Sequence, residues 1–167
     1  MKKGVLILIL GIGILFQSCK FYSFTGADVH PDLETFTVSR IVNQSSTVNP
    51  DLAINLQDGL VTRLNRQTSL QELPRNGGLV YDIIVESYTI QPTSISSGAV
   101  AAESQFRVGI KCTFTNSKEE KNNFEMAFSA TRNFPSTTTF QDAEQQFLGE
   151  IIDELVDKIF NESLANW

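Results

Sequence analysis

Residues 105–114 run Gln105-Phe106-Arg107-Val108-Gly109-Ile110-Lys111-Cys112-Thr113-Phe114, and apolar and polar side chains alternate along most of this stretch. Successive side chains of a β-strand point to opposite faces, so the pattern predicts a strand with one buried and one polar face. Arg107 and Lys111 are four residues apart and therefore lie on the same, polar face. We expect the opposite face, with Cys112 among its members, to lie in the core.

The segments on either side of this strand also have the composition of strands. Residues 124–131 alternate in the same way and follow the charged turn 116–123, which predicts an antiparallel hairpin. Residues 79–90 are rich in β-branched and aromatic side chains and predict another long strand. Between them, residues 91–102 form a loop of small and hydroxyl residues that is longer than a tight hairpin needs.

A first strand is predicted at residues 34–42, where Phe36 and Val38 alternate with polar residues. Arg40 and Val42 continue that side of the strand less well. The stretch 69–73 has the character of a short edge strand.

Two amphipathic helices complete the pattern. The first is predicted to begin at Pro50 with Asn49 as its N-cap, since proline fits the first turn and asparagine caps it. The second covers residues 139–164. Each has an apolar stripe with helical spacing; the stripes are Leu52, Leu56, Leu60 and Leu64 in the first helix, and Phe140, Ala143, Phe147, Ile151, Leu155 and Ile159 in the second.

The order strand, helix, strand, strand, strand, helix predicts an α+β fold. We expect a two-layer sandwich in which a mainly antiparallel, four-stranded sheet has both helices packed on one face. Residues 34–167 then form a single α+β domain, which is long enough to bury a substantial core.

The N-terminus has the features of a bacterial lipoprotein signal. Lys2 and Lys3 precede an apolar run at residues 4–16, and Ser18 stands just before Cys19. That run is shorter than the roughly 20 residues needed to cross a bilayer. We therefore expect residues 1–18 to be a lipoprotein signal peptide, Cys19 to be the lipid-anchor residue and residues 19–33 to be a lipidated tether. The alternative is an ordinary secreted protein whose cysteine lies near the cleavage site by chance.

The charge balance excludes one class of partner. The net charge is −6, and the predicted signal peptide removes two lysines and no acid, so the mature chain is still more acidic. Nucleic-acid binding depends on clustered lysine and arginine, so we expect no nucleic-acid partner. With Cys19 acylated, Cys112 has no second cysteine to pair with.

The usual catalytic constellations are missing. His30 is the only histidine, and it precedes a proline in the predicted tether, with no histidine or cysteine neighbour at metal-ligand spacing. No cysteine or carboxylate cluster has the spacing of a nucleophile with its base, so we expect no enzyme, no metal site and no cofactor.

Three basic residues remain as candidate ligand contacts. Arg107 and Lys111 share one strand face and Arg132 ends the next strand. In an acidic protein such residues can bind phosphate or carboxylate groups of a partner. The alternative is cross-strand pairing with Asp82, Glu86 or Glu125.

Several segments resemble the lipopolysaccharide-assembly lipoprotein (LptE) family. They are Cys19-Lys20-Phe21-Tyr22-Ser23-Phe24-Thr25-Gly26-Ala27, the Asn49-Pro50 helix start, and the closing Phe160 to Trp167. The resemblance spans the mature chain and agrees with that family's fold, a four-stranded sheet backed by two helices.

The resemblance implies a task without catalysis. Such proteins plug a large outer-membrane β-barrel and assist its assembly, and the pair inserts lipopolysaccharide into the outer leaflet. It also implies a location: anchored by lipid at the cell outer membrane, with the domain in the periplasm or the barrel lumen. The residues Arg107, Lys111 and Arg132 would then be candidate contacts to lipopolysaccharide phosphates. The alternative function is a periplasmic lipoprotein that binds a lipid or another apolar ligand.

Overall fold

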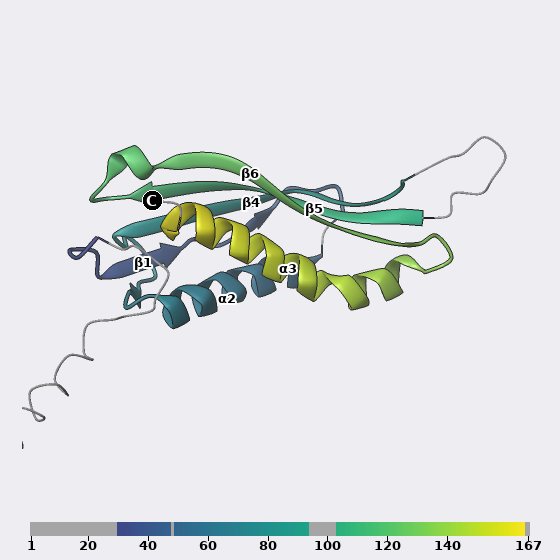
Figure 1. Cartoon of the computed structure of the whole chain (residues 1–167), viewed down its shortest axis with the longest axis horizontal. Helices are drawn as coiled ribbons and strands as arrows, with labels where there is room; N and C mark the ends of the chain where they lie inside the picture. Colours follow the sequence, from purple (N-terminus) through teal and green to yellow (C-terminus); the bar gives the residue numbers. More distant parts are fainter. Residues whose placement is uncertain (1–29, 48, 94–102, 166–167) are drawn as a thin grey trace, which may run out of the picture.

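A twisted β-sheet carries two long helices on one of its faces (Figure 1). This computed structural model describes residues 30–47, 49–93 and 103–165. In those ranges the strands are β1 (Thr35–Val38), β2 (Val42–Asn43), β3 (Gln71–Glu72), β4 (Leu79–Pro92), β5 (Glu103–Asn116) and β6 (Phe124–Pro135). The helices are α2 (Pro50–Gln67) and α3 (Phe140–Leu164), and the short 3₁₀ helix η1 (Glu120–Asn122) lies between β5 and β6.

The long strands β4, β5 and β6 form an antiparallel meander, as their alternation predicted. Every apolar residue of the β5 pattern is buried on the helix side; these residues are Phe106, Val108, Ile110, Cys112 and Phe114. The strands are longer than predicted, since β4 continues to Pro92 and β6 to Pro135. The predicted loop 91–102 therefore overlaps β4 at its start, and residues 94–102 of it lie outside the described residues.

The α+β fold with two helices is confirmed, but the predicted four-stranded, mainly antiparallel sheet is not matched in detail: the sheet is mixed and has more strands. The sheet of the described residues has six strands in the order β3-β1-β4-β5-β6, with β2 also paired to β4. β1 is parallel to both β3 and β4, and β2 is parallel to β4. The physical reason is the connection: α2 lies between these strands in the chain, and a helical crossover joins parallel strands.

The predicted first strand is broken into β1 and β2. Phe36 and Val38 point into the core as expected, but the alternation then shifts and Ile41 is buried. Arg40 is exposed and Val42 is 50% exposed. The shift buries an isoleucine in place of an arginine, which avoids taking an unpaired charge out of water.

The first helix, α2, begins as predicted. The Asn49 side-chain oxygen accepts hydrogen bonds from the backbone N–H groups of Asp51 and Leu52, at 2.8 and 3.1 Å. These bonds satisfy donors that have no partner inside the helix. The leucine stripe is fully buried; its members are Leu52, Leu56, Leu60 and Leu64.

A polar contact joins both helices to the sheet. The buried Tyr88 hydroxyl of β4 donates to Glu144 Oε1 of α3, and Asn49 Nδ2 donates to the same oxygen at 2.6 Å. Burial, followed by the hydrogen bond to Glu144, raises the pKa of Tyr88, so the phenol stays protonated. The start of each helix is thereby fixed above β4.

Candidate functional site: the open face of the sheet

The face of the sheet that points away from the helices is rich in hydroxyl, amide and charged groups. Because α2 and α3 cover the opposite face (Figure 1), the polar sides of β4, β5 and β6 form a continuous surface. This surface holds Ser87 and Thr89 of β4, Arg107 and Lys111 of β5, and Ser129 of β6. It is the candidate functional site, and we call it the open face.

A bulge shapes the centre of the open face. The register between β4 and β5 shifts between Val85 and Ser87, so that Ser87 pairs with Gly109. Gly109 leaves room for the Ser87 hydroxyl, which would have to rotate away if a methyl group replaced the glycine hydrogen. Two shallow hollows adjoin this position, and Arg107 and Ser87 line both. Their volumes are about 280 and 170 Å³.

Arg107 is exposed between these hollows, and Glu86 lines one of them with it, outside ion-pairing distance. The residues directly across from Arg107 are neutral. It pairs with Thr89 on β4 and Thr131 on β6, and its Nη2 lies 3.5 Å from the Ser129 hydroxyl oxygen. Among the described residues no carboxylate lies within 4.0 Å of its guanidinium. A guanidinium with hydroxyls beside it and no acid opposite is suited to binding a phosphate or carboxylate from a partner.

Lys111 lies on the same face but has an acidic partner. Its Nζ is 2.5 Å from Glu125 Oε1 on β6, which is one of the cross-strand pairs that the sequence allowed. The hydrogen bond and the charge of Glu125 raise the pKa of Lys111. Its charge is therefore largely balanced within the protein.

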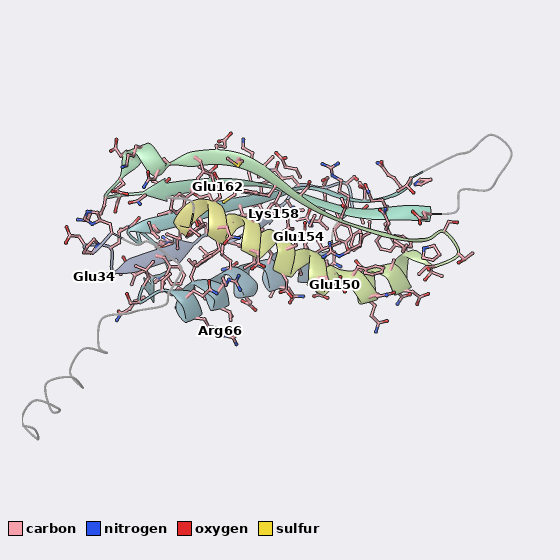
Figure 2. All side chains as sticks on the ribbon, viewed as in Figure 1. Glu34, Arg66, Glu150, Glu154, Lys158 and Glu162 are labelled. Atoms are coloured by element: carbon pink, nitrogen blue, oxygen red, sulfur yellow. The ribbon has the colours of Figure 1, made fainter. Side chains whose placement is uncertain are left out.

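Arg132 lies on the other face of the sheet. It pairs with the core residue Phe106, so its side chain points to the helix side. There its Nε lies 2.9 Å from Glu150 and its Nη1 2.6 Å from Glu154, with Lys158 beside Glu154 at 2.7 Å. Figure 2 shows Glu150, Glu154 and Lys158 spaced along α3. The structure thus brings Arg107 and Lys111 together and separates Arg132 from them.

The carboxylate of Glu154 is the centre of this ionic network. Hydrogen bonds from Lys158 and then Arg132 lower its pKa. The hydrogen bonds to Glu154 and Glu150 in turn raise the pKa of Arg132. The guanidinium of Arg132 is thus already occupied by two carboxylates.

The residues that might have carried catalysis lie apart. Burial raises the pKa of the Cys112 thiol to about 12, and none of the described residues forms a hydrogen bond to it as a base would. It is a core residue, as predicted. His30 Nδ1 accepts a hydrogen bond from the Asp32 backbone at 3.2 Å. No group of three metal-ligating side chains occurs within residues 30–47, 49–93 and 103–165. Cys19 lies outside the described residues.

A larger hollow of about 690 Å³ lies between α2 and α3. Its lining is mainly polar and includes Asn49, Asp51 and Glu144. It lies between the two helices, whereas a lipid carried inside the sandwich would lie between helices and sheet, among the buried core residues. A hollow of about 310 Å³ lies at the edge of that layer, between Ile41 and the start of α2. In the described part of the chain, neither helix is apolar enough over a sufficient length to cross a membrane.

Sequence reasoning missed the hydroxyl groups around Arg107. Ser87, Thr89 and Ser129 come from two other strands, and only the register of the sheet brings them to Arg107. One signal was present: a glycine inside an alternating strand often marks a bulge, and Gly109 is such a residue.

Comparison with known protein families identifies the chain's relatives. The family model described as LptE, lipopolysaccharide-assembly, matches residues 33–163, which is most of the chain. The chain belongs to the LptE family. The resemblance drawn from the N-terminal and helix-start motifs is thereby confirmed. A search of curated proteins finds no significant match.

Solved structures agree with LptE membership at the level of the fold. Lipoprotein B of Nitrosomonas europaea is similar, with a TM-score of 0.57 and 12% identity, over 84% of this chain and 86% of that one. The hypothetical protein CT253 of Chlamydia trachomatis has a TM-score of 0.51 at 6% identity, over 80% and 99% of the two chains. At these identities the similarity shows a shared α+β fold of two helices on a mixed sheet.

Proposed function

We propose that this LptE-family protein is a non-enzymatic outer-membrane lipoprotein that plugs a β-barrel partner, assists its assembly and helps it insert lipopolysaccharide into the outer leaflet. The observation that carries the proposal is the family match over residues 33–163. In this proposal Cys19 bears the lipid anchor and residues 1–18 are removed.

The physical character of the domain supports a plug. The lumen of a large outer-membrane barrel is polar, so a protein inside it needs a compact core and a polar exterior. The open face meets this need, since its central residues are hydroxyl, amide and charged groups. The packed layer between helices and sheet gives the body a rigid core.

Arg107 is the candidate contact to lipopolysaccharide phosphate that the geometry favours. It is exposed, it has the hydroxyls of Ser87 and Ser129 nearby, and in the described structure it lacks the acidic partner that Lys111 has. An arginine in such a setting binds phosphate through two parallel hydrogen bonds. Lys111 could bind the phosphate only if its ion pair with Glu125 were broken. Arg132 could bind it only if its ion pairs with Glu150 and Glu154 were broken.

Copurification tests both parts of the proposal. The full-length chain with a C-terminal affinity tag is extracted from membranes in mild detergent, and its partners are identified by mass spectrometry. We expect one β-barrel protein in a fixed ratio, together with lipopolysaccharide. A monomer that carries a small lipid and no barrel would contradict the plug function and support the periplasmic lipid-binding alternative.

The phosphate contact has its own control. R107Q is expected to lower the lipopolysaccharide recovered several-fold while the barrel partner stays bound. R66Q is the matched control, because Arg66 is an exposed arginine at the end of α2, far from the open face (Figure 2). If R107Q and R66Q recover equal amounts of lipopolysaccharide, Arg107 is not a contact to its phosphates. That result would not contradict the binding of the barrel partner.

A further inference from the structure

The bulge at Ser87 divides the open face into two halves. In the half that contains Lys111 and its ion pair, charged and apolar groups are mixed. In the other half, the residues across from Gln105, Arg107 and Gly109 of β5 are all neutral and polar. They are Ser87, Thr89 and Gln91 of β4, and Ser129, Thr131 and Asn133 of β6. We call these six residues, together with Gln105 and Arg107, the amide–hydroxyl half.

Many hydrogen-bonding groups of the amide–hydroxyl half are unused within the described structure. Gln105 Nε2 donates to Asn133 Oδ1 at 3.2 Å. Arg107 Nη2 lies 3.5 Å from the Ser129 hydroxyl oxygen. No side-chain hydrogen bond within the described residues is formed by the remaining members, which are Ser87, Thr89, Gln91 and Thr131. Each of these hydroxyl and amide groups can both donate and accept, and the hollow of about 280 Å³ is lined by members of this half alone.

Two carboxylates border the amide–hydroxyl half. Glu86 lines the smaller hollow beside Arg107, and Glu103 is the next residue beyond Gln105 on the same face of β5. Both are exposed. A carboxylate accepts hydrogen bonds from hydroxyl groups but repels a free phosphate ion. The combination therefore fits a ligand that has many hydroxyl groups and a single phosphate better than it fits an inorganic anion.

The rest of the surface limits which part of lipopolysaccharide can lie here. α3 carries seven acids and one lysine, α2 carries two acids and two arginines, and both helices cover the opposite face (Figure 1). Phosphate groups are thus repelled from the helix side of the domain. The large apolar side chains that the described structure exposes all lie outside the amide–hydroxyl half; they are Val42, Ile54, Leu73, Met126 and Phe140. An acyl chain would find no apolar surface there.

We propose that the amide–hydroxyl half binds the sugar units of lipopolysaccharide that adjoin a phosphate. Arg107 binds the phosphate, and the surrounding hydroxyl and amide groups bind the sugar hydroxyls, which also both donate and accept. The inference rests on the proposed function and deepens it, because it states that the saccharide contacts this face and that the acyl chains lie elsewhere.

Deacylated lipopolysaccharide is the probe that tests the sugar contact. It is soluble and keeps the sugars and phosphates but has no acyl chains. Its binding to the full-length chain in mild detergent is measured by isothermal titration calorimetry. We expect saturable binding that is several-fold tighter than the binding of inorganic phosphate measured in the same way.

A pair of isosteric variants tests the hydroxyl groups. T89V/T131V removes the hydroxyls on either side of Arg107 and keeps the shape and strand preference of the side chains. We expect its affinity for deacylated lipopolysaccharide to fall several-fold and its affinity for inorganic phosphate to stay unchanged. T113V/T115V is the matched control, because it replaces two threonines of β5 on the same face but outside the amide–hydroxyl half. It is expected to bind like wild type.

Three results would overturn the inference. They are the absence of binding by deacylated lipopolysaccharide, equally tight binding of inorganic phosphate, and equal affinities of T89V/T131V and T113V/T115V. None of them contradicts the proposed function, which depends on copurification of the barrel partner and of intact lipopolysaccharide. A chain that copurifies with no barrel contradicts the plug function, and the calorimetry on that chain still decides the sugar contact.

Discussion

The hydroxyl of Tyr88 in β4 donates a hydrogen bond to the carboxylate of Glu144 in α3, across the boundary between sheet and helices. Asn49, the residue that caps α2, donates to the same carboxylate. One carboxylate therefore holds three elements that lie far apart in the chain.

Y88F should lower the free energy of unfolding by about 1.5–3 kcal/mol, since a hydrogen bond to a charged group is lost from a buried position. Y81F is the control: its hydroxyl bonds the neutral Ser163 at 3.1 Å, and its loss should cost about 1 kcal/mol. Urea denaturation followed by circular dichroism measures both. Equal costs for the two variants would show that the charge of Glu144 contributes nothing.

E154Q should reduce stability in a way that depends on pH. The pKa of Glu154 is lowered by Lys158 and Arg132, so the folded state binds its proton less readily than the unfolded state. The stability that Glu154 contributes is therefore complete at neutral pH and is lost as the pH falls through the lowered pKa. We expect a difference of about 1 kcal/mol or less at pH 7, shrinking in acid and in 1 M salt. A difference that grows in acid would contradict the network.

G109A should destabilise the protein by about 1 kcal/mol or less, because its methyl group forces the Ser87 hydroxyl at the bulge into another rotamer. The double variant S87A/G109A removes that hydroxyl and should recover part of the loss. Thermal melts of the wild type, both single variants and the double variant form a cycle that isolates the contact. Strict additivity would show that the cost of G109A arises elsewhere.

Cys112 should resist alkylation in the folded protein. Its pKa is raised to about 12, so at pH 8 almost all of it is the unreactive thiol, and the side chain is fully buried. Iodoacetamide labelling of the peptide that contains residue 112, followed by mass spectrometry, should become fast only at denaturant concentrations that unfold the domain. Rapid labelling in native buffer would mean that the core opens locally at β5.

The helices and the central strands were predictable because their patterns are long and regular. Four leucines at helical spacing can be buried together only on one face of a helix, as in α2. Five alternating apolar residues can be buried together only on one face of a strand, as in β5. Arg132 was predictable in part. Counting by twos from Phe124 reaches residue 132, which places it on the apolar side, but only the folded chain brings Glu150 and Glu154 to neutralise it.

The remaining features depend on contacts between distant segments. The shift that buries Ile41 and exposes Val42 follows from packing against the core, and nothing local in residues 34–42 specifies it. The bulge at Ser87 appears only when β4 meets β5, and the hydroxyl groups around Arg107 follow from that register. The direction of β1 relative to β4 is an exception, because it could be predicted from the sequence. A helix lies between the two strands in the chain, and such a connection joins parallel strands.

The parallel pairing of β1 with β4 also constrains the route by which the chain folds. The meander from β4 to β6 is built from neighbouring segments and needs only short loop closures, so it can form early and fast. β1 gains its place only after α2 has crossed over, at the cost of a long closure. A polypeptide that emerges N-terminus first therefore exposes β1 before β4, its partner in the sheet, has emerged. A chaperone that keeps the chain unfolded must therefore cover β1 for longer than the strands of the meander.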